Sequence, residues 1–192
     1  LSEDLDGKLQ DADLIIDTSA SLAVSRKLSR MREYKGRRIS FFLNPKGDTL
    51  ICIAEDVKRE VTLNELEAYY YQLLYNEPSL NSHFVNEHKG IRYGNSCRDV
   101  SNFIPNERFG IFSSIATGVL KELENEDMGF IRIWQLNERF GINHFQAKPT
   151  AFKKCTVGEW SINISHEQLD KMFKKRIEKL PAETGGILVG LI

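Results

Sequence analysis

In the first third of the chain, short apolar runs alternate with a stretch whose apolar residues recur at helical spacing. This alternation constrains the fold more than any other feature of the sequence. Residues 13–17 form an apolar run between two acids, and residues 22–31 have apolar side chains at helical spacing. Two further apolar runs, 39–43 and 50–54, flank the turn-forming residues 44–48. We therefore expect a buried strand, a helix, and two strands joined by a tight turn. This order predicts an α/β fold.

A helix is well indicated after residue 61. Thr62-x-x-Glu65 is a capping box, in which the side chain of each residue accepts from the backbone N–H of the other. Apolar residues then recur at helical spacing up to Pro78: Leu63, Leu66, Tyr70, Leu73 and Leu74. The following residues 76–105 are polar and broken by Gly and Pro, which predicts a long connection.

A second helix is expected after this connection, followed by a hairpin. The helix should place one apolar face on the core, made of Phe109, Phe112, Ala116, Val119 and Leu123. Residues 130–134 and 142–145 are apolar runs that we interpret as the two strands of a closing hairpin.

A domain boundary is predicted near residue 149, because residues 148–158 show no clear period. We assign 150–158 to a linker and 159–192 to a second part. That part should begin with a strand at 160–164 and a helix from Ser165. The helix has lysines on one side and apolar residues on the other, which are Leu169, Met172, Phe173, Ile177 and Leu180. Such a helix lies at a surface, and its lysines need no partner.

Composition excludes several classes of protein. The net charge is −1, with 41% hydrophobic and 28% charged residues, which is typical of a globular protein without a nucleic-acid partner. No apolar run approaches the ~20 residues that span a bilayer, so no membrane partner is expected. The three cysteines lack metal or disulfide spacing, which favours reduced thiols in the cytoplasm. Because the chain starts at Leu1 and ends on an apolar run, we expect a fragment of a longer protein.

The segment from Asp13 to Val24 resembles the strand-to-helix turn of ThiF-type, or E1-like, adenylating enzymes. The resemblance covers roughly residues 1–149 and implies the C-terminal half of a Rossmann-like adenylating fold, with a crossover region at 57–105. It also implies that Asp17, Thr18 and Ser19 lie beside ATP, at the carboxyl end of a parallel strand. The alternative is a structural turn whose Thr and Ser side chains cap the next helix.

One departure from the family bears on its magnesium ion. Many members place a second acid shortly after the residue that matches Asp17, where it helps to hold Mg²⁺ on the phosphates. Here the chain has Ser19-Ala20-Ser21, with Ala20 in place of an acid. The resemblance implies ATP and Mg²⁺ in the full-length adenylating domain, whose glycine-rich loop would precede Leu1. Neither cofactor is expected to bind this fragment alone.

Cys97 lies in the crossover region, where thioester-forming members of the family have their nucleophilic cysteine. The adjacent Arg98 and the start of the next helix would favour its thiolate form. The alternative is an inert loop thiol, with Arg98 paired to Asp99. Cys52 falls in an alternating apolar strand and is expected in the core, whereas Cys155 falls in the predicted linker.

A second resemblance lies near the end of the chain, in Glu183-Thr-Gly-Gly-Ile-Leu-Val-Gly190. This segment is similar to the opening strand of JAMM (MPN) metallopeptidases, so 159–192 would be the truncated start of such a domain, with its first strand, helix and strand. The resemblance makes Glu183 the general acid/base for a zinc-bound water. The zinc ligands would follow Ile192, so no metal site is expected here. A Glu before Gly-Gly in an ordinary turn is the alternative.

Together the two resemblances predict a fusion of an E1-like enzyme with a deconjugating peptidase. The implied partners are a ubiquitin-like or sulfur-carrier protein, an E2-like protein and a second copy of the chain as a homodimer. Two alternatives remain open. The region could be a catalytically idle interaction or dimerisation scaffold with a ThiF-like fold, or a fragment of an unrelated Rossmann-like dehydrogenase.

Overall fold

The computed structural model describes residues 3–31, 33–80, 83, 91–92, 100–101, 104–149, 152–158 and 160–181. The chain divides into two compact units, Leu1–Lys148 and Pro149–Ile192. The fold is mixed α/β, which confirms the predicted class.

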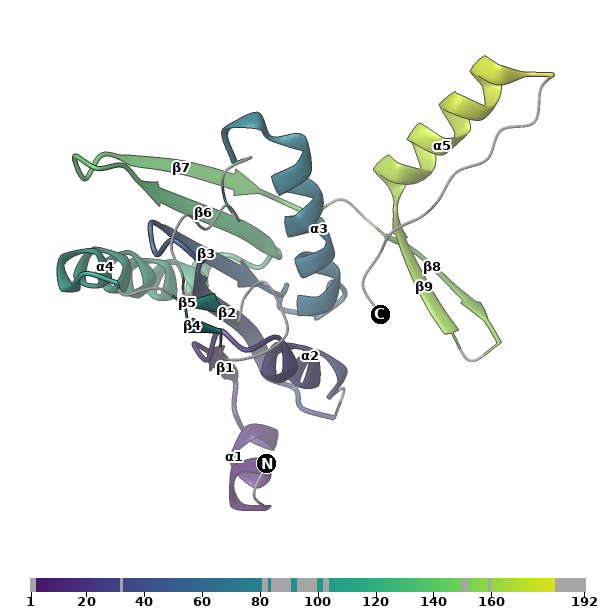
Figure 1. The fold of residues 1–192 in the computed structure, drawn as a ribbon. Coiled ribbons are helices and arrows are strands. Elements are labelled where there is room, and N and C mark those ends of the chain that lie inside the picture. The colour runs from purple at the N-terminus through teal and green to yellow at the C-terminus, as the bar shows by residue number, and fades with distance from the viewer. Residues whose placement is uncertain are drawn as a thin grey trace. The chain divides into compact units, whose positions relative to one another are not determined.

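The first unit contains most of the secondary structure (Figure 1). In chain order its elements are α1 (Glu3–Gln10), β1 (Leu14–Asp17), α2 (Leu22–Arg30), β2 (Arg37–Leu43), β3 (Thr49–Ala54), α3 (Leu63–Asn76), η1 (Pro78–Leu80), β4 (Ile91–Arg92), β5 (Val100–Ser101), α4 (Asn106–Glu122), η3 (Leu123–Asn125), β6 (Phe130–Leu136) and β7 (Ile142–Ala147). Every strand and helix predicted before residue 148 is present in this set.

Five of these strands form one mixed sheet with the order β1-β2-β3-β6-β7. β1 pairs with β2 in parallel, and the crossover between them is α2. The three other pairings, β2 with β3, β3 with β6 and β6 with β7, are antiparallel. The remaining pair, β4 and β5, is a separate two-residue ladder within the crossover region.

Helices cover both faces of the sheet, with α3 on one face and α4 on the other (Figure 1). Alternate residues of the central strands therefore enter two different cores. On the α4 side, Phe41 and Cys52 pack with Phe112, and on the α3 side, Phe42 and Ile51 pack among residues of α3. Because both faces are covered, every residue of β2 and β3 except Leu43 is buried, including the polar residues Arg37, Arg38, Ser40 and Thr49.

The capping-box helix forms as predicted. The Thr62 N–H donates to the Glu65 carboxylate at 2.7 Å, and the Leu63 N–H donates to Glu55 Oε1 at 2.9 Å, so two of the free N–H groups at the helix start are satisfied. The predicted apolar face of α3 is buried or half-buried. In α4 one predicted core residue is wrong, because Phe109 is 62% exposed and the buried contacts of the helix begin with Phe112.

The second unit contains an antiparallel hairpin, β8 (Phe152–Val157) with β9 (Trp160–Ser165), followed by α5 (His166–Lys179). The predicted strand and helix are confirmed, and Ser165 caps α5 by accepting from the Gln168 N–H at 3.3 Å. The linker assigned to 150–158 is corrected, since β8 occupies most of it. Pairing with β9 around Gly158, whose φ is +60°, supplies the backbone hydrogen bonds that the sequence pattern did not reveal.

The last predicted strand, which contains Glu183, lies outside the described residues. No helix in the described parts of the chain combines the length and the hydrophobicity needed to cross a membrane.

Candidate functional site

The turn between β1 and α2 contains all three residues predicted to contact a nucleotide. Asp17 ends β1 and is 4% exposed, whereas Thr18 and Ser19 are exposed. Asp17 Oδ1 accepts from the Ser19 N–H at 2.9 Å and from the Ser19 hydroxyl at 2.6 Å. This is an Asx-turn, in which a carboxylate fixes the backbone two residues later.

The second oxygen of Asp17 joins the turn to the neighbouring strand. Asp17 pairs with Ser40 in the parallel β1–β2 ladder, and the Ser40 hydroxyl donates to Asp17 Oδ2 at 3.3 Å. Further along the turn, the Ser21 N–H donates to Ser19 Oγ at 3.2 Å. Ser21 is the N-cap residue of α2, but its side chain makes no capping bond. The polar side chains are therefore organised by Asp17 rather than by capping of the helix.

Backbone strain is localised in the same turn. Ala20 has a φ of +55°, a left-handed conformation that alanine rarely adopts. Such a residue persists only where its surroundings hold it, at a cost of roughly 1–3 kcal/mol. Here the Asp17–Ser19–Ser21 hydrogen bonds flank Ala20 on both sides.

This turn does not fit a magnesium site. Both oxygens of Asp17 already accept hydrogen bonds, the residue is nearly inaccessible, and Ala20 offers no ligand. Among the residues that the structure describes, no group of three or more His, Cys, Asp or Glu side chains could hold a metal ion. What the turn does present outward is the hydroxyl group of Thr18, which can donate to an anionic ligand, whereas the Ser19 hydroxyl already donates its proton to Asp17.

A second turn lies at the same edge of the sheet. Beyond Ser40, β2 continues through residues 41–43, about 10 Å of extended chain, and ends in the turn at 44–48. Asn44 organises that turn, because its Oδ1 accepts from the N–H groups of Asp48 and Thr49, each at 3.1 Å. Since β1 and β2 are parallel, the Asp17 turn and the Asn44 turn both lie beyond the carboxyl end of β1.

The Asn44 turn contacts His83 and Ile104, the described residues on either side of the stretch 84–103. On one side, Asn44 Nδ2 donates to the backbone carbonyl of His83 at 3.2 Å. On the other side, Ile104 packs against Gly47, where a Cβ would lie 2.8 Å from Ile104 Cγ1. The two described residues that flank the stretch 84–103, which contains Cys97, thus both contact one turn. Cys97 itself lies outside the described residues, as does Glu183.

His83 is a buried residue at this site that the sequence pattern did not single out. It is 2% exposed, and its Nε2 lies 2.6 Å from the Tyr70 hydroxyl of α3. Burial lowers the pKa of His83 to about 4, so the ring is neutral at physiological pH. A lone histidine within a polar stretch carries no periodic signal, so only its contacts with α3 and Asn44 identify it.

The two described cysteines differ in environment. Cys52 lies in β3 and is fully buried, as predicted, and burial raises the pKa of its thiol. Cys155 lies on β8 and is exposed, with its Sγ 3.6 Å from the Ile162 carbonyl oxygen. Neither thiol lies in the first unit's turn region, so neither competes with Cys97 as a candidate nucleophile there.

In comparisons with known proteins, the sequence matches no family model and no curated protein.

Proposed function

We propose that residues 1–149 form the C-terminal half of an E1-like adenylating domain, which activates the C-terminus of a ubiquitin-like or sulfur-carrier protein. Residues 159–192 would then begin a JAMM-type metallopeptidase domain. The arrangement of the first unit carries the proposal. The Asp17 turn and both anchors of the Cys97-containing segment lie at one edge of the sheet.

The proposed reaction has two steps, and it would require the nucleotide-binding turn and the nucleophilic cysteine at the same edge of the sheet. In the first step, the carboxylate of the carrier protein attacks the α-phosphorus of ATP and releases pyrophosphate, giving an acyl adenylate. In the second step, the Cys97 thiolate attacks the acyl carbon, AMP leaves, and a thioester forms. The exposed hydroxyl of Thr18 would bind the nucleotide, and the bonds of Asp17 to Ser19 would hold the turn in place. No step is assigned to Mg²⁺, because the described residues form no site for it.

The peptidase part of the proposal depends on the order of elements in the second unit. The hairpin strand β9 and the helix α5 precede Glu183, in the order that the resemblance implies for a JAMM domain. In a domain of that type Glu183 would act as general acid/base beside zinc, whose ligands would lie downstream of this sequence.

A catalytically idle scaffold is the second candidate, and the environment of Asp17 favours it. Each oxygen of this carboxylate is already used within the protein, and the strained Ala20 occupies the position where many E1-like enzymes have an acid. In this candidate the same edge of the sheet would dock a partner or a second copy of the chain without nucleotide chemistry.

ATP–pyrophosphate exchange by the full-length protein, in the presence of its ubiquitin-like carrier, separates the two candidates. We expect carrier-dependent exchange that Thr18→Val lowers at least about tenfold, the effect of losing a hydrogen bond to a charged ligand. Thr117→Val, at an exposed position on α4, is the matched control. Carrier binding without any exchange would support the scaffold instead.

Thiol reactivity tests the transfer step independently of exchange. Iodoacetamide should label Cys97 faster than the exposed Cys155, and it should not label the buried Cys52 in the folded protein. With carrier and ATP, a thiol-sensitive conjugate should form on the wild type and on Cys155→Ser but not on Cys97→Ser. A conjugate that survives Cys97→Ser would remove Cys97 from the mechanism.

A further inference from the structure

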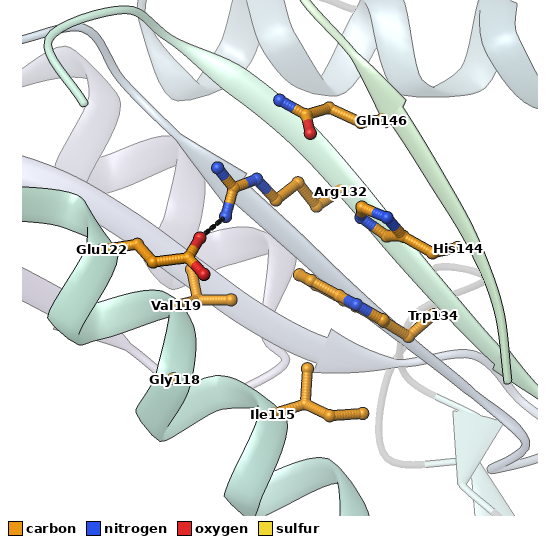
Figure 2. Close-up of a pocket in the computed structure, with 8 residues that line it drawn as sticks. All are labelled: Ile115, Gly118, Val119, Glu122, Arg132, Trp134, His144 and Gln146. Carbon is orange, nitrogen blue, oxygen red and sulfur yellow. Dashed lines mark hydrogen bonds and ion pairs between the residues drawn. The ribbon is translucent and has the colours of Figure 1, made fainter. Parts of the chain in front are cut away.

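A pocket of about 240 Å³ lies between α4 and the β6–β7 hairpin (Figure 2). Helix α4 contributes Ile115, Gly118, Val119 and Glu122 to its wall. The two strands contribute Arg132 and Trp134 from β6, and His144 and Gln146 from β7. These residues come from three elements of the same unit.

Arg132 is the unusual member of this set. It is 9% exposed, and among the described residues its one hydrogen-bond partner is Glu122, whose Oε2 accepts from Nη1 at 2.6 Å. The buried Nε has no partner. A guanidinium offers five N–H donors, and leaving buried donors unused is costly.

Arg37 shows what a structural arginine looks like in the same protein. It is 8% exposed, and its Nε, Nη1 and Nη2 all donate to backbone carbonyls, those of Glu55, Leu123, Glu126 and Met128. Its donors are therefore used to hold the chain that follows α4. Arg132 is as deeply buried, and its guanidinium lies over the ring of Phe130 with Cζ 4.4 Å from the centroid, but among the described residues its one hydrogen-bond partner is Glu122, whose side chain is 66% exposed. Glu122 can therefore return to water if another anion replaces it.

The rest of the pocket is uncharged. The rings of Trp134 and His144 stack at a centroid distance of 5.0 Å and an interplanar angle of 17°. Burial, followed by the nearby positive charge of Arg132, lowers the pKa of His144, so its imidazole is neutral at pH 7. Ile115 and Val119 supply aliphatic surface opposite these rings (Figure 2).

We propose that this pocket binds a small carboxylate with a compact apolar body, through the guanidinium of Arg132. The carboxylate would accept from Arg132 in competition with Glu122, and its body would lie among Ile115, Val119 and the aromatic pair. The volume is below the range typical of drug-sized ligands, and it suits an acid of about ten heavy atoms or the last residue of a peptide.

Sodium benzoate is a suitable first probe, titrated into the 192-residue chain while the two tryptophan indole N–H signals are followed by NMR. We expect saturable shifts of the Trp134 signal with a Kd of about 1 mM. The Trp160 signal, from the second unit, serves as the internal control. Benzyl alcohol, which has the same ring but no charge, should bind at least about tenfold more weakly.

Three variants make the test specific. Glu122→Gln removes the competing carboxylate from an exposed position, so benzoate should bind more tightly, by several-fold. Gly118→Leu should abolish binding by filling the pocket, because a Cβ at Gly118 meets nothing within 4 Å and the helix can accept it. Arg132→Lys should weaken benzoate binding about tenfold. If this variant does not fold, Glu122→Gln and Gly118→Leu test the proposal without it.

The source of the carboxylate is distinguished by comparing benzoate with N-acetylphenylalanine and its amide. Tighter binding of N-acetylphenylalanine, lost in the amide, indicates a peptide C-terminus, and tighter binding of benzoate indicates a free acid. The proposal is overturned if benzoate and benzyl alcohol shift Trp134 equally, if Trp160 responds as strongly, or if Glu122→Gln weakens binding.

Discussion

The hydroxyl of Tyr70 lies 2.6 Å from Nε2 of His83, and this buried contact ties His83, which precedes the stretch that contains Cys97, to α3. Tyr70→Phe should lower the free energy of unfolding by about 1 kcal/mol, because it removes one buried hydrogen bond and leaves the ring packing in place. Urea denaturation measures this difference. Tyr75→Phe is the matched control on the same helix, since Tyr75 is 87% exposed and its hydroxyl faces solvent. An equal loss in both variants would contradict the assigned role of His83.

The neutral state of His83 should make stability depend on pH. Its pKa is lowered to about 4 in the folded protein, from an ordinary value of 6.5, so the unfolded chain binds more protons between these values. The contribution of His83 to the free energy of unfolding is therefore complete above pH 6.5. It is lost as pH falls towards 4, and the loss is at most about 3 kcal/mol.

Glu55 acts in the opposite direction, since burial raises its pKa to about 7, and its contribution decreases as pH rises from 4.5 to 7. The contribution of His83 is therefore measured as the difference in the free energy of unfolding between the wild type and His83→Gln. We expect the stability advantage of the wild type over His83→Gln to shrink as pH falls from 6.5 to 4. A pH-independent difference would show that His83 is not titrating as a buried neutral ring.

Gly47→Ala should destabilise the protein by about 2 kcal/mol. Its φ of +66° disfavours any Cβ, and the new methyl group would meet Ile104 at 2.8 Å. Gly110→Ala is the control, because Gly110 lies in α4 with nothing within 4 Å of a Cβ and alanine is the better helix former. Thermal unfolding should therefore move in opposite directions for the two variants. Adding Ile104→Ala to Gly47→Ala should restore part of the loss if the clash is real.

Arg37→Met should cost about 3 kcal/mol or more, since it leaves carbonyl groups after α4 without their donor. Arg37→Lys should recover a minority of this loss, because one ammonium cannot reach carbonyls on several sides. Arg139→Lys, at an exposed position, should lie within about 0.5 kcal/mol of the wild type. Denaturant unfolding of the three variants ranks them, and similar values for Arg37→Met and Arg139→Lys would overturn the role given to Arg37.

Local patterns predicted the elements of the first unit well. The capping box at Thr62 and the apolar period of α3 locate that helix, and the turn residues 44–48 locate the β2–β3 hairpin. β8 was missed because its side chains are mostly exposed, so no alternation of apolar residues marks it. It is a strand because β9 pairs with it, and the sequence of β8 alone does not show which segment will pair with it.

The candidate site was predictable in part. The Asp17 turn could be located from sequence because an acid, a hydroxyl pair and a helix start follow one another directly. The anchoring contacts could not, because His83 and Ile104 meet the Asn44 turn from distant parts of the chain. The Arg132 pocket could not be predicted from sequence for the same reason, since three separate elements form it.

The joint anchoring of His83 and Ile104 on one turn also bears on how such a chain can evolve. A segment whose ends are held together is a closed loop, and doubling its length raises the entropy cost of closure by only about 0.6 kcal/mol. Among the described residues, neither core includes a residue between these two anchors. The fold can thus accept new material at this point at a cost of only about 0.6 kcal/mol for each doubling of the loop.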